Sequence, residues 1–535
     1  MNIAHLLQEQ AQARPTTPAL IDRIGGHDRV ISFGELQQQV TQAAALLHQA
    51  GLRPGDNVLV FQPMSLELYV ALIALFRLGL VAMFIDPSAG REHIEQCCTL
   101  IPPQALIASP KAHVLRLLSP ALRRIPRKFV IGARLPGALP WSSAQYLEPR
   151  EDIYPAEPET PALLTFTSGS TGLPKAALRT HGFLLAQHSV LERASGVQSS
   201  EVSLTTMPIF VLANLASGIT SLIAAGNLRK PGSIDPGPII EQIERYQPTR
   251  AEAAPSFWEC IIAACREQQR QLLGLRVIYA GGAPVFPRVL AGLQEIAPQA
   301  EIVAVYGSTE AEPIAHVAYN ELRAQDLAAM MEGSGLLAGT PALELQVRIL
   351  PEQWGTALTP YTARTFDEAC LAAGEPGEIV VCGPHVLAGY LYGRGDEETK
   401  FRVGDTIWHR TGDMGYFDSQ GRLWLLGRCT ARIKDEHGIL YPFTVECAVS
   451  SSPAIRRAAA ASVRGQRILA LELDKQDRCL DQVMLSRTVA WANFAAIQVY
   501  PHIPVDKRHN AKIDYPALKR LLERKRPENQ VPIFK

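Results

Sequence analysis

The chain has 535 residues, which is too many for one hydrophobic core, so two or more domains are expected. Apolar residues make up 47% and charged residues 19%, a balance that is typical of globular proteins and excludes a largely disordered chain. Lys plus Arg and Asp plus Glu each number 52, and no dense Lys/Arg block occurs, so we expect no nucleic-acid partner.

The first 85 residues predict a protein that is neither exported nor membrane-spanning. The N-terminus reads as an amphipathic helix and lacks the pattern of a signal peptide. The longest apolar stretch, residues 68–85, contains Arg77 at its centre and Gly79, so it predicts a buried helix followed by a buried strand. The nine cysteines show no metal-ligand spacing and fit a reducing compartment. We therefore expect a cytoplasmic location.

Strand and helix patterns alternate through the first 420 or so residues. Residues 33–50 have apolar side chains at helical spacing. Short runs rich in β-branched residues are typical of strands in a covered, largely parallel sheet, and they occupy residues 57–63, 80–86, 105–109 and 128–132. This alternation predicts α/β layers.

Three later strands end in small, flexible, hydroxyl-rich residues. They are "ALLTF" before "TSGSTG", "LRVIY" (275–279) before "AGGAP", and "EIVAVY" (301–306) before "GSTEAE". Ligands of α/β sheets bind at the carboxyl ends of the strands, so the three loops predict one shared pocket.

Residues 428–535 show a different pattern of predicted strands and helices from the residues before them. They combine predicted strands at 456–463, 467–474 and 497–501 with a helix over 480–495 and a basic helix from about Tyr515. We therefore predict an α/β fold with a large multi-sheet N-terminal domain, residues 1–427, and a small α+β C-terminal domain, residues 428–535.

The loop in "TFTSGSTGLPK" (165–175) is suited to an anion. It fails the Walker A pattern, because Pro174 takes the second glycine position and Ala176 follows Lys175. Four hydroxyl groups, two glycines whose backbone N–H groups can turn inward, and one lysine remain as donors. These residues are Thr167, Ser168, Ser170, Thr171, Gly169, Gly172 and Lys175.

The motifs together resemble one superfamily. "TFTSGSTGLPK", "YGSTE", "RTGDMGYFDSQGRLWLLGR" and "DKRHNAKID" occur in this order, with "GTP" at 339–341. The chain is thereby similar, over nearly its whole length, to the adenylate-forming enzymes, which include acyl-CoA synthetases and peptide-synthetase adenylation domains. The resemblance implies a large adenylation domain, a small mobile lid domain, and activation of a carboxylic acid by ATP and Mg²⁺.

The resemblance also implies a role for each motif residue. Residues 167–172 and Lys175 would enclose the β- and γ-phosphates. Thr309 would bond the α-phosphate, Glu310 would hold Mg²⁺, and Lys512 would stabilise the charge that develops during attack. The remaining nucleotide contacts would come from Gly281, Gly282, Ala283, Tyr306, Gly307, Ser308, Asp413 and Arg428.

Departures from the common pattern concern the second half-reaction. Val211 in "MPIFVLANLASG" stands where many acyl-CoA synthetases have a histidine, and Thr430 takes the place of the hinge aspartate. With these departures the sequence resembles the olefin-pathway β-lactone synthetases, which adenylate a β-hydroxy acid and close a lactone without CoA. Candidate residues for lining the acyl pocket are Phe210, Val211 and Asn214.

Other second steps stay open at the level of sequence. They are thioester formation with CoA and acyl delivery to a carrier protein or an amine. The alternative outside catalysis is an inactive homologue that only binds nucleotide. The joint presence of Glu310, Asp413 and Lys512 argues against the inactive homologue. CoA is not expected but not excluded. The expected partner is a small carboxylic acid, and the branch also allows assembly with other pathway enzymes.

Overall fold

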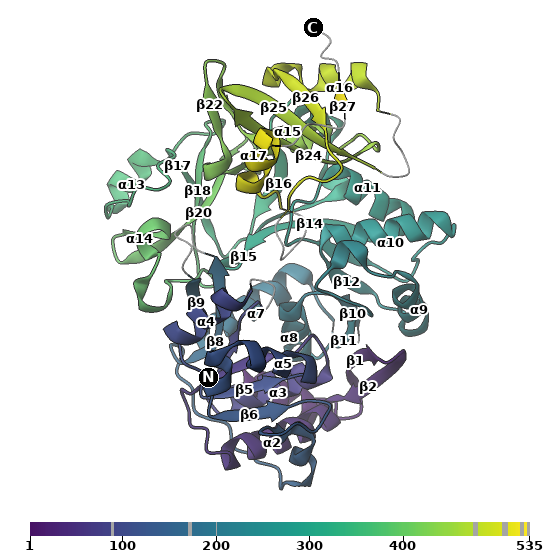
Figure 1. Cartoon of the computed structure of the whole chain (residues 1–535), viewed down its shortest axis with the longest axis vertical. Helices are drawn as coiled ribbons and strands as arrows, with labels where there is room; N and C mark the ends of the chain where they lie inside the picture. Colours follow the sequence, from purple (N-terminus) through teal and green to yellow (C-terminus); the bar gives the residue numbers. More distant parts are fainter. Residues whose placement is uncertain are drawn as a thin grey trace. The chain divides into compact units, whose positions relative to one another are not determined.

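The computed structural model describes residues 1–86, 90–168, 174–198, 201–474, 480–505, 512–524 and 529–531 (Figure 1). It divides into two compact units. The first unit contains residues 1–229, 234–252 and 384–396, and the second contains residues 230–233, 253–383 and 397–535. Within the described ranges, no helix is both long and apolar enough to cross a bilayer.

A seven-stranded sheet forms the centre of the first unit. The strand order is β7-β6-β5-β3-β4-β8-β9, and all neighbours are parallel except the β8–β9 hairpin. This confirms the four early strands that the sequence predicts. The strands are β3 (Asn57–Phe61), β4 (Val81–Phe84), β5 (Ala105–Ala108), β6 (Arg127–Val130), β7 (Leu139–Pro140), β8 (Pro161–Ser168) and β9 (Pro174–Thr180).

Both faces of this sheet are buried. Val58 and Val60 of β3 pack in one core cluster with residues of two helices, α2 (Phe33–Gln49) and α3 (Leu66–Arg77). The alternate residue Leu59 packs in a second cluster with Ile94 and Cys97 of α4 (Arg91–Leu100). Successive side chains of a strand point to opposite faces, so a sheet covered on both sides requires the continuous apolar runs seen in the sequence.

The predicted break in residues 68–85 is confirmed. Helix α3 ends at Arg77, whose buried guanidinium donates from Nε to the Arg150 carbonyl at 3.1 Å. Gly79 follows with φ +66°, and a Cβ there would lie 2.5 Å from the Tyr154 ring. The turn thus requires glycine for both its backbone conformation and its packing.

A second set of strands completes the first unit. Its order is β12-β10-β11-β1-β2, and only the β1–β2 pair is antiparallel. The strands are β1 (Pro18–Ile24), β2 (His27–Ser32), β10 (Val202–Thr205), β11 (Thr220–Ile223) and β12 (Arg250–Ala253). The other helices are α1 (Ala4–Ala13), α5 (Pro110–Leu118), α6 (Pro120–Arg124), α7 (His181–Ser195), α8 (Pro208–Ala216) and α9 (Gly237–Tyr246).

The second unit contains a mixed sheet of order β17-β18-β20-β21-β16-β15-β14-β13, with β19 beside β20. Only β13 and β14 are parallel neighbours, as expected of the two strands that were predicted from 275 and 301. The strands are β13 (Val277–Ala280), β14 (Glu301–Ser308), β15 (Ala311–Ala318), β16 (Leu336–Pro341), β17 (Gln346–Leu350), β18 (Gly377–Cys382), β19 (Lys400–Val403), β20 (Thr406–Phe417) and β21 (Leu423–Arg428). The helices are α10 (Pro255–Glu267), α11 (Pro287–Ile296), α12 (Ala324–Met331), α13 (Ala363–Ala369) and α14 (Asp396–Thr399).

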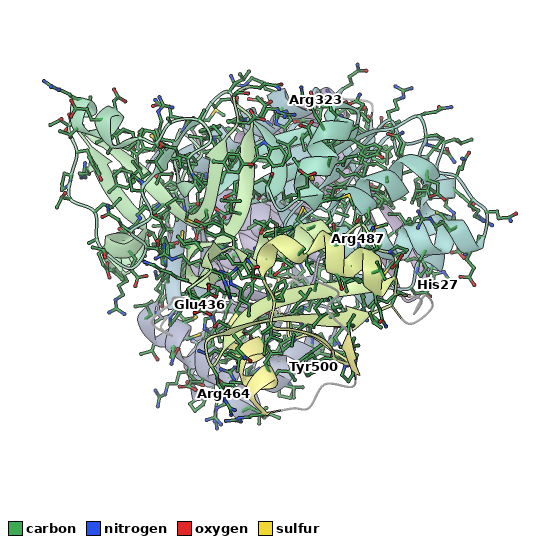
Figure 2. All side chains as sticks on the ribbon, turned by 90° about the horizontal axis from the view of Figure 1, so that it is seen from above. His27, Arg323, Glu436, Arg464, Arg487 and Tyr500 are labelled. Atoms are coloured by element: carbon green, nitrogen blue, oxygen red, sulfur yellow. The ribbon has the colours of Figure 1, made fainter. Side chains whose placement is uncertain are left out.

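Residues 428–535 carry a separate four-stranded sheet of order β24-β25-β26-β27. Figure 2 labels Tyr500, which lies just after β26 and packs in a small core with Leu518. The predicted helix over 480–495 is shorter, because the chain leaves α16 for a 3₁₀ turn and reaches a left-handed conformation at Asn493. The elements are β22 (Ile433–Asp435), β23 (Gly438–Leu440), α15 (Pro442–Val449), β24 (Ile455–Val463), β25 (Gln466–Leu473), α16 (Gln482–Thr488), β26 (Ala496–Val499), α17 (Tyr515–Arg524) and β27 (Asn529–Val531).

The proposed boundary between residues 427 and 428 lies inside the second unit. The Phe443 ring is 5.9 Å from the Phe286 ring, and the Cys447 thiol donates to the Gly335 carbonyl at 3.5 Å. Residues 428–535 thus have their own sheet and also pack on the sheet before them. The division into domains 1–427 and 428–535 stays a prediction.

A buried carboxyl group lies between β10 and β12 of the first unit. The Ser203 hydroxyl is 2.8 and 2.6 Å from the two carboxylate oxygens of Glu252, whose side chain is almost completely buried. Burial raises the pKa of Glu252 to about 7. The neutral acid is therefore favoured in the folded protein at pH values where the unfolded chain is ionised.

This raised pKa predicts a dependence of stability on pH. The contribution of Glu252 to the free energy of unfolding is fully present below its ordinary pKa of 4.5. This contribution is lost as the pH rises through its folded-state pKa of about 7. The loss amounts to roughly 3 kcal/mol, since one pKa unit corresponds to about 1.4 kcal/mol. Glu252→Gln should remove this loss, so the difference in unfolding free energy between variant and wild type should grow between pH 4.5 and 7. Chemical denaturation at several pH values measures it, with exposed Glu9→Gln as the control, and parallel curves would contradict the prediction.

Candidate functional site

Three predicted nucleotide-binding residues meet in the second unit. The Tyr306 hydroxyl, at the end of β14, donates to Asp413 Oδ2 at 2.7 Å. Arg428 lies opposite Asp413 in the β20–β21 pair, and its Nε is 3.2 Å from Asp413 Oδ1. Burial and the Asp413 charge raise the pKa of Tyr306, so the phenol stays protonated and donates. A carboxylate has about four acceptor positions, so Asp413 can also accept from two vicinal hydroxyl groups.

The strand that carries Asp413 is fixed by a buried ion pair. Arg410 donates from Nε and Nη2 to both oxygens of Glu378 on β18, at 2.6 to 3.1 Å, and both side chains are almost fully buried. Its third nitrogen donates to the Thr356 carbonyl at 2.7 Å. Three residues after Arg410, the Asp413 N–H donates to the Thr411 hydroxyl at 3.0 Å. Backbone and side-chain bonds together therefore define the position of the Asp413 carboxylate.

Glu310 lies in the turn between β14 and β15, close to a buried histidine. The Glu310 N–H donates to the Ser308 hydroxyl at 3.2 Å, which closes the turn after Thr309. The charge of Glu310 acts on His409, which lies opposite Lys400 in the β19–β20 pair. Burial, and then the Lys400 charge, lower the pKa of His409 to about 3, so the imidazole is neutral. Its Nδ1 lies 3.2 Å from the Thr399 carbonyl.

The donor set around Glu310 fits a magnesium ion that arrives with a nucleotide. Among the described residues, no group of three or more His, Cys, Asp or Glu side chains could hold a metal by itself. Mg²⁺ is commonly bound through one or two carboxylates and the phosphates of the substrate, rather than by a cage of protein ligands. A single carboxylate at Glu310 is consistent with that mode.

Small residues bring the backbone close at the ends of β13 and β14. A Cβ at Gly281 would lie 3.1 Å from the Val305 carbonyl oxygen, and Gly282 has φ +78° before Ala283. At Gly307 a Cβ would lie 3.2 Å from the Ala311 carbonyl oxygen. The backbone therefore approaches its neighbours closely at Gly281 and Gly307, and the contact with the nucleotide base that the resemblance implies for these residues stays a prediction.

The phosphate loop belongs to the first unit and is described only at its two ends. Strands β8 and β9 pair Thr167 with Lys175 and Ser168 with Pro174. The predicted donors Gly169, Ser170, Thr171 and Gly172 lie outside the described residues. The hairpin therefore brings the first hydroxyl residue and the lysine of the motif side by side.

Lys175 is buried against a segment that the sequence did not single out. Its Nζ lies 5.8 Å from the centre of the Tyr390 ring, and its side chain would be 2.6 Å from a Cβ at Gly395. Gly395 also has φ +95°, so only glycine fits this close approach without strain. An interaction between a cation and an aromatic face orients the lysine.

The acyl-pocket candidates lie on α8 of the first unit. Val211 is fully buried in the core cluster that also contains Leu215 and Ile223. Asn214 is 4% exposed, and its Nδ2 has no hydrogen-bond partner among the described residues. Phe210, one position before Val211, is half-buried. The position of the common histidine is thus occupied here by a packed aliphatic side chain.

Lys512 and Thr430 are placed in the C-terminal part of the second unit. Lys512 precedes Ile513, which pairs with Val505, and α17 begins three residues later. The first residue of that helix, Tyr515, donates to Glu446 of α15 at 2.5 Å, which anchors the segment that follows Lys512. Thr430 is exposed in the 3₁₀ turn at residues 429–431, and nearby Arg432 forms an ion pair with Glu352.

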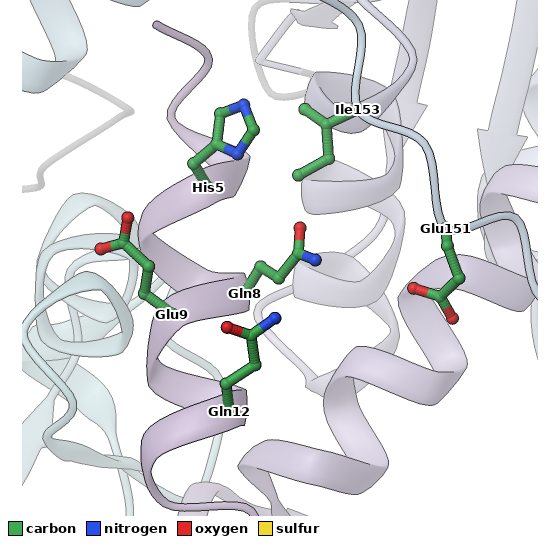
Figure 3. Close-up of a pocket in the computed structure, with 6 residues that line it drawn as sticks. All are labelled: His5, Gln8, Glu9, Gln12, Glu151 and Ile153. Carbon is green, nitrogen blue, oxygen red and sulfur yellow. The ribbon is translucent and has the colours of Figure 1, made fainter.

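The structure also brings together residues that the sequence did not single out. Sequence reasoning did not find His409, Lys400 or Arg410, since only the pairing of β18, β19 and β20 brings them together. His181, which follows the phosphate-loop hairpin, is fully buried, and its Nδ1 accepts the Ile3 N–H at 3.2 Å. An open polar hollow of about 370 Å³ lies beside α1 (Figure 3), and no predicted site residue lines it. Its lining is His5, Gln8, Glu9, Gln12, Glu151 and Ile153.

Comparison with known proteins identifies the family. A family model described as AMP-binding enzyme matches residues 7–391. The chain belongs to this family. It is 30% identical to an olefin beta-lactone synthetase of Stenotrophomonas maltophilia, over 96% of each chain. It is also 28% identical to a feruloyl-CoA synthase of Amycolatopsis, over 85% of each chain.

A solved structure agrees with the fold. An amide bond synthetase from Marinactinospora thermotolerans superimposes with a TM-score of 0.79 at 21% identity, covering 97% of this chain and 99% of that one. The predicted adenylate-forming fold and the resemblance to the β-lactone synthetase branch are therefore confirmed. The protein is a carboxylate-adenylating ligase.

The contact between Tyr306 and Asp413 yields a prediction about nucleotide affinity. Tyr306→Phe keeps the ring but removes a hydrogen bond to a charged group, which contributes about 1.5 kcal/mol or more. The KM for ATP should therefore rise about tenfold in ATP–pyrophosphate exchange. Tyr306→Leu, which also removes the ring, should weaken ATP further. An unchanged KM in the Phe variant would show that the hydroxyl does not orient Asp413 for binding.

Proposed function

We propose that the protein adenylates a β-hydroxy carboxylic acid and closes it to a β-lactone with release of AMP. The observation that carries this proposal is 30% identity to an olefin beta-lactone synthetase over 96% of both chains. Val211 and Thr430 support it, because this chain departs there from the common pattern of CoA ligases. Each step below assigns roles to the residues whose geometry is described above.

In the first step a carboxylate oxygen of the substrate attacks the α-phosphorus of ATP, and the bond to pyrophosphate breaks. Asp413 would accept the two ribose hydroxyls, and Thr309 would bond the α-phosphate. Glu310 would hold Mg²⁺, which neutralises phosphate charge when bound. Lys512 would stabilise the negative charge that develops between carboxylate and α-phosphate. Positioning and charge stabilisation suffice, since the step needs no protein nucleophile.

In the second step the β-hydroxyl oxygen attacks the acyl carbon of the adenylate. The carbon–oxygen bond to AMP breaks, a four-membered ring closes, and the hydroxyl proton is released. This nucleophile is already part of the substrate, so the step requires orientation rather than a channel for CoA. The buried aliphatic Val211 and the exposed Thr430 fit an enzyme in which the histidine and the hinge aspartate of CoA ligases are dispensable.

Lys512→Ala should abolish most acyl-adenylate formation. Loss of one preorganised cation at a developing charge costs roughly 3 to 4 kcal/mol, or a 10²- to 10³-fold drop in kcat. ATP binding, measured by calorimetry without the acid, should change little. Lys519→Ala on the exposed face of α17 is the matched control. Pyrophosphate release at wild-type rate in Lys512→Ala would refute the assignment.

The ring closure is tested by product analysis. A β-hydroxy acid with Mg·ATP and no CoA should yield AMP and a neutral lactone, which mass spectrometry identifies. The matched acid without the hydroxyl should form only the acyl-adenylate and pyrophosphate. If product forms only after CoA is added, the enzyme is a CoA ligase, as the similarity to feruloyl-CoA synthase would then suggest.

A further inference from the structure

Helix α5 of the first unit, which is labelled in Figure 1, has exposed apolar side chains on its outer side. Its inner side packs through His113, whose Nε2 lies 3.0 Å from the Phe129 carbonyl of β6. Its outer side carries Val114, Leu117 and Leu118, which are 56%, 76% and 59% exposed. These residues have the i, i+3, i+4 spacing of one helix face, so the pattern is the reverse of an ordinary surface helix, whose outer face is polar.

The chain around α5 is basic throughout. Between Gln96 and Leu147 the sequence has no Asp or Glu. The same stretch has seven cationic residues, of which Lys111, Arg123, Arg124 and Arg134 are exposed. The complete set is Lys111, Arg116, Arg123, Arg124, Arg127, Lys128 and Arg134. In a chain with equal numbers of acidic and basic residues, this is a local excess of positive charge.

Neighbouring elements leave this charge uncompensated. Within the described part of the chain, no carboxylate lies within ion-pair distance of any of the seven cations. The pKa of Lys128 is lowered, first by burial and then by the like charge of Arg116. The two cations are therefore close enough to repel each other. Glu95 of α4 contacts this region but accepts hydrogen bonds from the Ser119 hydroxyl and the Ala121 N–H instead.

We propose that α5 and α6 form a docking surface for an anionic lipid bilayer. The basic face is defined here as Lys111, Arg123, Arg124 and Arg134 with the apolar stripe Val114, Leu117 and Leu118. Apolar side chains enter the boundary between head groups and acyl chains while flanking cations meet lipid phosphates, which is how amphipathic helices bind membrane surfaces. A nucleic acid would match the charge but leave the leucines in water.

Two further features agree with a bilayer as the occupant. Leu139 and Tyr146 add exposed apolar surface within the same acid-free stretch, at 48% and 81%. Tyrosine side chains are favoured at membrane–water interfaces because the ring is apolar and its hydroxyl remains hydrated. The Arg116 guanidinium also reaches the loop before Leu139, lying 3.5 Å from the Cβ position of Gly137, so this loop and α5 are neighbours.

The full-length protein should bind anionic vesicles. In sedimentation it should partition onto an equal mixture of phosphatidylcholine and phosphatidylglycerol, but not onto phosphatidylcholine alone, and added salt should weaken the binding. Leu117→Ser/Leu118→Ser and Arg123→Glu/Arg124→Glu should each lower the partition coefficient at least about tenfold. Both double variants should keep the melting temperature and the ATP–pyrophosphate exchange rate of the wild type.

Matched controls come from the second unit. Leu343→Ser changes an apolar residue that is 97% exposed, and Arg364→Glu/Arg402→Glu changes the net charge by the same amount as the α6 variant. The proposal would be overturned if the control variants lowered the partition coefficient as much as the α5 and α6 variants do. It would also be overturned if the wild type did not bind anionic vesicles. Sedimentation equilibrium showing self-association that the leucine variant abolishes without any vesicle binding would overturn it as well, since the face would then join two copies. Competition by duplex DNA at equal phosphate concentration would assign the cations to nucleic acid instead.

Discussion

The buried ion pair between Arg410 and Glu378 is the constraint on which the nucleotide side of the second unit depends. A charged guanidinium can be buried only if its donors are satisfied, because an unpaired ion in the interior costs several kcal/mol. Arg410 meets this requirement with both oxygens of Glu378 and the Thr356 carbonyl. The pair therefore fixes β20 against β18 and, with it, the position of Asp413.

The chemistry assigned to this protein asks little of any single side chain. Adenylation needs a carboxylate for the ribose, a carboxylate for the metal and a cation near the reacting atoms, and Asp413, Glu310 and Lys512 are of those types. What distinguishes the relatives is the second nucleophile. A substrate that carries its own hydroxyl frees the α8 position and the hinge position to change, which is consistent with Val211 and Thr430.

The surface around α5 has physical features that the proposed reaction does not explain. Soluble surfaces rarely combine an apolar helix stripe with a long stretch free of acidic residues. Here both features occur in the same 52 residues, Gln96 to Leu147, while the inner side of α5 is packed normally through His113. An enzyme whose substrate carries an acyl chain would gain access to that substrate at a membrane surface.

The sequence by itself determined the local features whose causes are local. Apolar runs between turns predicted β3, β4, β5 and β6, the Arg77–Gly79 pair predicted the break after α3, and motif spacing predicted the family. Only the tertiary structure decided which distant residues meet. The contacts of Tyr306 with Asp413, of Lys175 with Tyr390, and of His409 with Lys400 depend on strand order and register. These join residues without any periodic signal along the chain, because side chains on neighbouring strands are adjacent in space whatever their separation in sequence.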